Sequence, residues 1–100
     1  MSTIIISTIQ EARASAAEWL FDHLADRFAA GIPEHDSELG LWRIPVWLSY
    51  PGLEPLGPIG DLVLADTTGQ VREHTPIDDL KARALKLYQQ NRERIEAPLS

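Results

Sequence analysis

Three histidines are the imidazole groups available to this chain, and their surroundings decide what chemistry they could do. His35 lies in the segment 34–38, E-H-D-S-E, where carboxylates and an imidazole could together hold a divalent cation. The segment does not fit a calcium loop, which needs alternating acidic residues, a glycine and a late glutamate. No histidine has a second histidine at i+4, and the chain has no C-x-x-C motif. We therefore expect a solvated acidic loop at 34–38 and no metal site.

Other motifs that would support catalysis or cofactor binding are incomplete. Residues 57–60, G-P-I-G, lack the lysine and the hydroxyl residue of a phosphate-binding loop, and we expect a structural turn there. No serine lies in a G-x-S-x-G elbow. The pair Asp78 and Asp79 is explained by favourable placement at the positive end of a helix. The sequence thus predicts no catalytic residue, no cofactor and no enzymatic activity.

The tryptophans give a more informative pattern. Trp42 lies on the inward face of a predicted strand and Trp19 beside a core-facing helical stripe, and both are expected in the core. Trp47 points to the opposite face of a predicted strand, where an exposed apolar patch would mark an interaction surface. Alternatively, a proline-rich loop folds back over Trp47, and the sequence leaves both alternatives open. The residues of the predicted interaction surface are Leu41, Arg43, Pro45, Trp47, Leu53 and Leu56.

The strands that would position these residues occupy the middle of the chain. Residues 41–50 alternate apolar and mixed side chains with the two-residue period of a strand, and residues 61–66 and 70–74 predict two more. We expect a turn at 66–69 and a loop at 51–60, which contains three prolines and three glycines. Residues 4–6 form either a fourth short strand or a frayed end.

Two amphipathic helices are predicted to flank these strands. Apolar residues recur at helical spacing from Ile9 to Phe28, with a capping box at Ser7 or Thr8 and a helix end at Gly31. The acidic loop follows this helix. Thr75 is expected to cap the second helix and Pro76 to occupy its first position, with an apolar stripe from Ile77 to Ile95.

These elements predict one α+β domain over residues 1–100, in the order α-β-β-β-α. Its small antiparallel sheet has three strands, or four if residues 4–6 pair. Both helices need an apolar surface, and we expect them to pack on the same face of the sheet.

Composition limits the possible functions. The chain has 100 residues, no cysteine and a formal net charge of −6. Residues 1–66 contain three basic and ten acidic side chains, which disfavours nucleic-acid binding there. We read no signal peptide and no membrane-spanning segment, and so expect a cytoplasmic protein without membrane or nucleic-acid partners.

The string from Leu62 to Val71, L-V-L-A-D-T-T-G-Q-V, resembles a strand and turn of PepSY-like and related small prokaryotic α+β modules. The resemblance covers about a third of the chain, residues 42–75, and implies a binding or inhibitory unit. The helix after the last strand departs from that pattern. The whole chain is also similar to uncharacterised bacterial small proteins.

We therefore expect a protein–protein interaction or regulatory module whose partner is another protein or a second copy. One alternative is a toxin-neutralising or inhibitory partner that uses its acidic surface against a basic groove. The other is a small-ligand-binding module whose pocket lies between residues 51–60 and the sheet.

Overall fold

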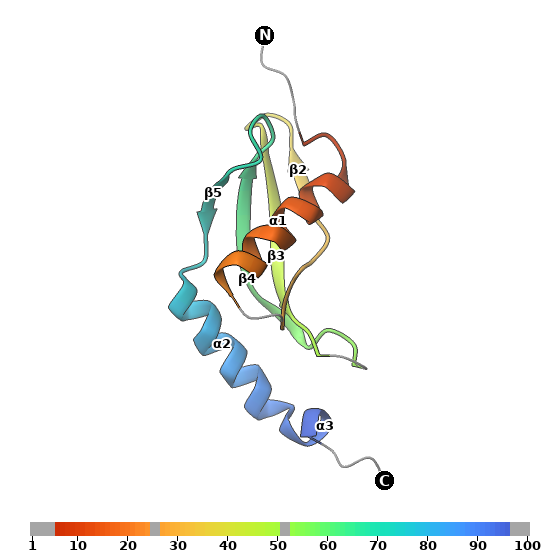
Figure 1. Cartoon of the computed structure of the whole chain (residues 1–100), viewed down its shortest axis with the longest axis vertical. Coiled ribbons are helices and arrows are strands. Elements are labelled where there is room, and N and C mark those ends of the chain that lie inside the picture. Colours follow the sequence, from red (N-terminus) through yellow and green to blue (C-terminus); the bar gives the residue numbers. More distant parts are fainter. Residues whose placement is uncertain (1–5, 25–26, 51–52, 97–100) are drawn as a thin grey trace.

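The fold is α+β, with a helix before and a helix after an antiparallel sheet (Figure 1). The computed structural model describes residues 6–24, 27–50 and 53–96. Within these ranges, the elements in chain order are α1 (Ile9–His23), β1 (Phe28–Ala30), β2 (Glu34–Asp36), β3 (Leu41–Leu48), β4 (Gly57–Ala65), β5 (Val71–His74), α2 (Ile77–Gln90) and the short α3 (Arg92–Glu96).

The described residues form five strands in one sheet, not three. The strand order is β1-β3-β4-β5, and β2 also pairs with β3. Both β1 and β2 run antiparallel to β3, with Ala30 opposite Val46 and Glu34 opposite Arg43. Three residues, 31–33, therefore lie opposite two on β3, and the edge strand bulges between its two halves.

The two additional strands correct two predictions. The first helix was expected to continue to Phe28, but it ends at His23, and Phe28–Ala30 pairs with β3 instead. The predicted acidic loop contains β2, whose three residues are all exposed.

The loop expected at 51–60 is shorter than predicted, because β4 begins at Gly57. Of the segment 4–6, residues 4 and 5 lie outside the described ranges, and Ile6 belongs to no strand but donates to the Asp66 carbonyl.

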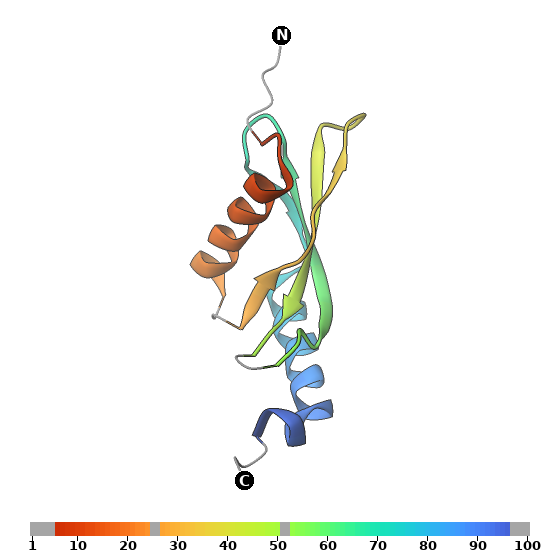
Figure 2. The ribbon, with the colours of Figure 1, turned by 90° about the vertical axis from the view of Figure 1, so that its right-hand side faces the viewer.

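The core lies on one face of the sheet, which we call the core face. Alternate residues of β3 (Trp42, Ile44, Val46, Leu48) point to it, and their partners Leu62 and Leu64 on β4 join them. Ala12, Ala16 and Leu20 of α1 pack there, on one side of the sheet in Figure 2. The predicted core position of Trp42 is confirmed.

The start of α2 also packs against the core face, near the N-terminal end of β4. Gly60 pairs with Val46, so a side chain at Gly60 would point toward the core face. A Cβ there would lie 2.6 Å from Leu80 Cδ2 and 2.6 Å from Thr75 Oγ1. The absence of a side chain at Gly60 therefore lets the first turn of α2 approach the sheet, and the rest of the helix runs past the end of the sheet (Figure 1).

The helix starts differ from the predictions in detail. α1 uses the Thr8–Glu11 capping box, one of the two predicted registers. α2 has Pro76 as its N-cap residue and no side-chain cap. Thr75 was expected to cap this helix, but its hydroxyl accepts a hydrogen bond from the Asp61 N–H at 2.9 Å. In the part of the chain that the structure describes, no helix combines the length and apolarity needed to cross a bilayer.

The capping box predicts a pH dependence of stability. Hydrogen bonds from the Thr8 and Ser7 hydroxyls and backbone N–H groups lower the pKa of Glu11 from its ordinary value of 4.5. Because the folded-state pKa is lowered, the contribution of Glu11 is complete above pH 4.5 and declines as the pH falls through the folded value. Urea unfolding followed between pH 7 and pH 3 should therefore show a smaller acid-induced loss of stability in Glu11→Gln. Identical pH profiles would contradict this role.

Candidate functional site

The candidate site is the face of the sheet opposite the core, which we call the reverse face. Strand register places on it twelve residues: Leu41, Arg43, Pro45 and Trp47 of β3, Pro58, Asp61, Val63 and Ala65 of β4, Ala29 of β1, Glu34 and Asp36 of β2, and Glu73 of β5. Val63 and Ala65 are 8% and 5% exposed, yet they do not belong to the core cluster. The reverse face is therefore a separate surface.

One row of residues crosses the reverse face from edge to edge. Glu34 lies opposite Arg43, Arg43 opposite Val63, and Val63 opposite Glu73. Carboxylates thus occupy the two ends of the row, and a guanidinium and an apolar side chain lie between them. Arg43 is exposed and makes no ion pair or hydrogen bond with another described residue. Its charge is consequently available to an external group.

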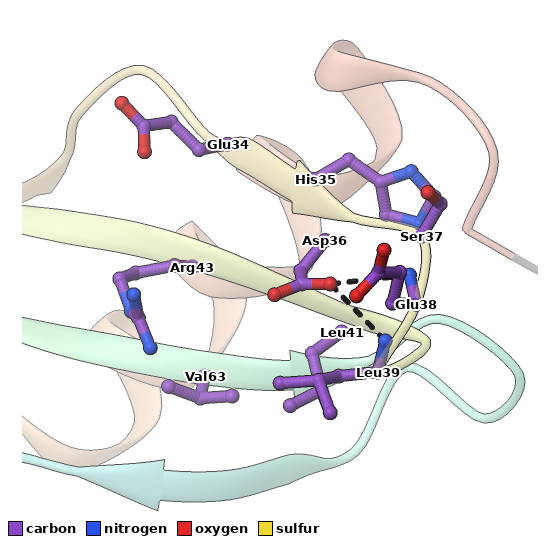
Figure 3. A pocket seen from close by; sticks show the side chains of 9 residues that line it. All are labelled: Glu34, His35, Asp36, Ser37, Glu38, Leu39, Leu41, Arg43 and Val63. Atoms are coloured by element: carbon purple, nitrogen blue, oxygen red, sulfur yellow. Dashed lines mark hydrogen bonds between the residues drawn. The ribbon is translucent and has the colours of Figure 1, made fainter.

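Two hollows flank Arg43. The first, of about 430 Å³, is lined by Arg43, Val63, Leu41 and the acidic segment 34–38 (Figure 3). Asp36 orders this segment because its Oδ1 accepts from the backbone N–H groups of Glu38 and Leu39, both at 3.1 Å. The second hollow, of about 410 Å³, shares Arg43 and Val63 and is lined on its other side by Asp61, Glu73, His74 and Thr75. Each hollow therefore combines an apolar surface with carboxylates.

Trp47 is half-buried, and neither of the two predicted arrangements describes it fully. Its indole lies against the backbone of Gly31, in the bulge between β1 and β2, where any Cβ would collide with the ring and would come within 2.7 Å of Pro45 Cγ. The indole Nε1 is buried without a hydrogen-bond partner among the described residues. Trp47 therefore contributes packing across the edge strand and leaves part of its surface exposed.

The other two residues of the predicted surface lie elsewhere. Leu56 packs against the core cluster, and its N–H donates to the Leu48 carbonyl. Leu53 is half-buried, and its N–H donates to the Tyr50 carbonyl. Since Leu56 packs on the core and β4 starts at Gly57, less of the 51–60 segment is free to form a ligand pocket than expected.

The sequence did not predict a polar pair between the buried Asp66 and the exposed His35. Asp66 is 3% exposed, and its Oδ2 accepts from His35 Nε2 at 2.9 Å. The His35 ring also stacks on Trp42, with centroids 4.5 Å apart, and the Trp42 Nε1 donates to the Ile6 carbonyl. His35 and Asp66 are 31 residues apart, so no local pattern could have indicated their contact. The pair joins β2 to the β4–β5 turn, which is a structural role.

The other two histidines both contact Trp19. His23 stacks on the indole at 4.2 Å and His74 contacts it at 4.8 Å, and each Nδ1 donates to a backbone carbonyl. Trp19 was expected in the core, but it is half-buried and packs against the core cluster from outside. In the described parts of the chain, no three His, Cys, Asp or Glu side chains are grouped so that they could hold a metal ion.

Comparison with known proteins adds no family assignment. No protein-family model matches the chain, and neither a curated protein nor a solved structure is significantly similar to it. The resemblance to PepSY-like modules therefore stays a prediction.

The contact between Trp47 and Gly31 can be tested by Gly31→Ala. The added Cβ has no space beside the indole and Pro45, so we expect a loss of roughly 1–3 kcal/mol in the free energy of unfolding. Ile32→Ala is the control on the same edge, because Ile32 is 72% exposed and its truncation should change stability by less than about 0.5 kcal/mol. Equal stability of the Gly31→Ala and wild-type proteins in urea would contradict the packing described.

The His35–Asp66 pair predicts a graded response at Asp66. Asp66→Ala leaves the His35 N–H without its acceptor and should cost about 1–3 kcal/mol of unfolding free energy. Asp66→Asn keeps the side-chain volume and a carbonyl oxygen in place and should cost less. Chemical denaturation of both variants at pH 7 measures the difference. Equal losses would show that the retained carbonyl oxygen contributes nothing, and would contradict the graded response.

Proposed function

We propose that this protein works by protein–protein contact and that the reverse face is its contact surface. The supporting observation is the row Glu34, Arg43, Val63 and Glu73. It places a guanidinium that has no ion-pair or hydrogen-bond partner among the described residues, beside the largely buried Val63, at the centre of a face against which neither α1 nor the start of α2 packs. Partly exposed Leu41, Pro45 and Trp47 supply apolar surface along β3. A module of this kind needs no catalytic residue.

The edges of the sheet support binding through the face. β2 has the sequence Glu-His-Asp, is exposed throughout, and follows a bulge that contains Pro33. β5 is four residues long and has an irregular register against β4. Charges, proline, bulges and short strands are the features by which proteins prevent another strand from adding to an edge. A partner would therefore contact side chains of the reverse face and not the backbone of an edge.

The contact surface can be tested by photo-cross-linking. A photoreactive amino acid at position 43 should form a covalent adduct with one protein in the organism that encodes this chain. The same group at position 17, exposed on α1, should not. Adding Leu41→Asp should abolish the adduct, because it places a charge in the apolar strip, whereas Leu85→Asp on α2 should not.

Two results would contradict the proposal. One is an adduct that forms equally from positions 43 and 17. The other is an adduct from position 43 that is unaffected by Leu41→Asp in a variant shown by circular dichroism to be folded.

A further inference from the structure

We infer that the reverse face binds a basic protein partner, with lysine or arginine side chains entering the hollows on either side of Arg43. This inference rests on the proposed function and specifies the chemistry of the partner. Four carboxylates lie on the reverse face, from Glu34, Asp36, Asp61 and Glu73. They outnumber the guanidinium of Arg43 and that of Arg72, which lines a further hollow with Leu41 and Ala65. All four acidic residues are exposed. Their charges favour a positively charged partner by electrostatic complementarity.

The geometry of the hollows explains how long basic side chains would fit. Leu41 and Val63 line the first hollow together with the carboxylates of segment 34–38 (Figure 3), and Val63 lines the second together with Asp61 and Glu73. Lysine and arginine bury their aliphatic stems on apolar surface while keeping the charged group in polar surroundings. Arg43 lines both hollows and repels a basic group next to it, so the entering basic groups would lie toward the carboxylates on the far side of each hollow from Arg43.

A second copy of this chain fits the surface poorly. In a symmetric dimer formed through the reverse face, the same patch would lie on both subunits. The acidic residues of one copy would then approach the acidic residues of the other, and like charges across an interface cost several kcal/mol. The net charge of −6 adds to the repulsion. The charge pattern therefore favours a different, basic protein.

The inference can be tested with a fluorescein-labelled peptide of four Lys-Ala repeats. The triple variant Glu34→Gln, Asp61→Asn, Glu73→Gln removes three charges from the reverse face. The matched control, Glu18→Gln, Asp22→Asn, Glu93→Gln, removes the same three charges from exposed positions on α1 and α3. At low ionic strength, we expect the dissociation constant to rise about tenfold for the first variant and less than about twofold for the control. NMR shifts on adding the peptide should concentrate in β2, β3 and β4.

If the two variants weaken peptide binding equally, the peptide is attracted by net charge alone, and the inference is overturned. NMR shifts centred on the helices would also overturn it. This failure is distinguishable from failure of the proposed function. If the cross-link from position 43 persists in the triple variant, the proposal that the reverse face is the contact surface stands, and the inference that the partner is basic is contradicted. Peptide binding confined to the reverse face, without any position-specific cross-link, would support the charge preference and reject the protein contact.

Discussion

The alternation of side chains along β3 is the constraint on which the rest of the structure depends. This strand pairs with β1, β2 and β4, so it lies inside the sheet along its whole length. Its even-numbered residues from Trp42 to Leu48 are buried with the helices, and its odd-numbered residues form the centre of the reverse face. A shift of one residue in its pairing would exchange the two sets. The core and the candidate site are therefore specified by the same eight residues.

Contacts at one end of β3 and at its middle hold the strand in this register. At the end, the His35–Asp66 pair joins β2 to the β4–β5 turn, and the Asp66 N–H donates to the Gly40 carbonyl. In the middle, the Gly31 N–H donates to the Pro45 carbonyl while the indole of Trp47 lies against Gly31. Interactions between elements, more than the helices alone, thus position the charged residues of the reverse face. A surface held in this way is preorganised, which lowers the entropic cost of binding.

The sequence predicts those elements whose buried residues repeat at the regular spacing of a strand or a helix. Residues 41–48 and the Ala12, Ala16 and Leu20 stripe repeat at the spacing of a strand and a helix, and both elements are found. Leu24 and Phe28 continue the helical spacing, yet Phe28 pairs with Leu48, because tertiary pairing outweighs local periodicity. β2 has no buried residue and thus no apolar pattern that could reveal it. The sequence does not predict the start of β4, because Gly57, Pro58 and Gly60 are residues typical of loops. In the structure these residues accommodate a bulge and the approach of α2.

The candidate site was predictable to a similar extent. The four β3 residues of the predicted surface lie together on the reverse face because alternation alone places them there. Their acidic neighbours come from β2, β4 and β5, and only the register between strands brings Glu34 and Glu73 into one row with Arg43. Leu53 and Leu56 were assigned by their proximity in sequence to Trp47, and Leu56 instead completes the core. Thr75 accepts a hydrogen bond from the Asp61 N–H and does not cap α2, and this too is a contact between residues distant in sequence.

The central claim is that β3 has one face in the core and one face open to a partner. The chain has no cysteine, so single cysteines introduced one at a time from position 41 to position 48 can be labelled without background. We expect a thiol at position 43 to react with a soluble maleimide nearly as fast as in the unfolded chain, and thiols at positions 44 and 46 to be protected by orders of magnitude. Equal protection at positions 43 and 44, in variants that remain folded, would show that the reverse face is covered and would contradict the account.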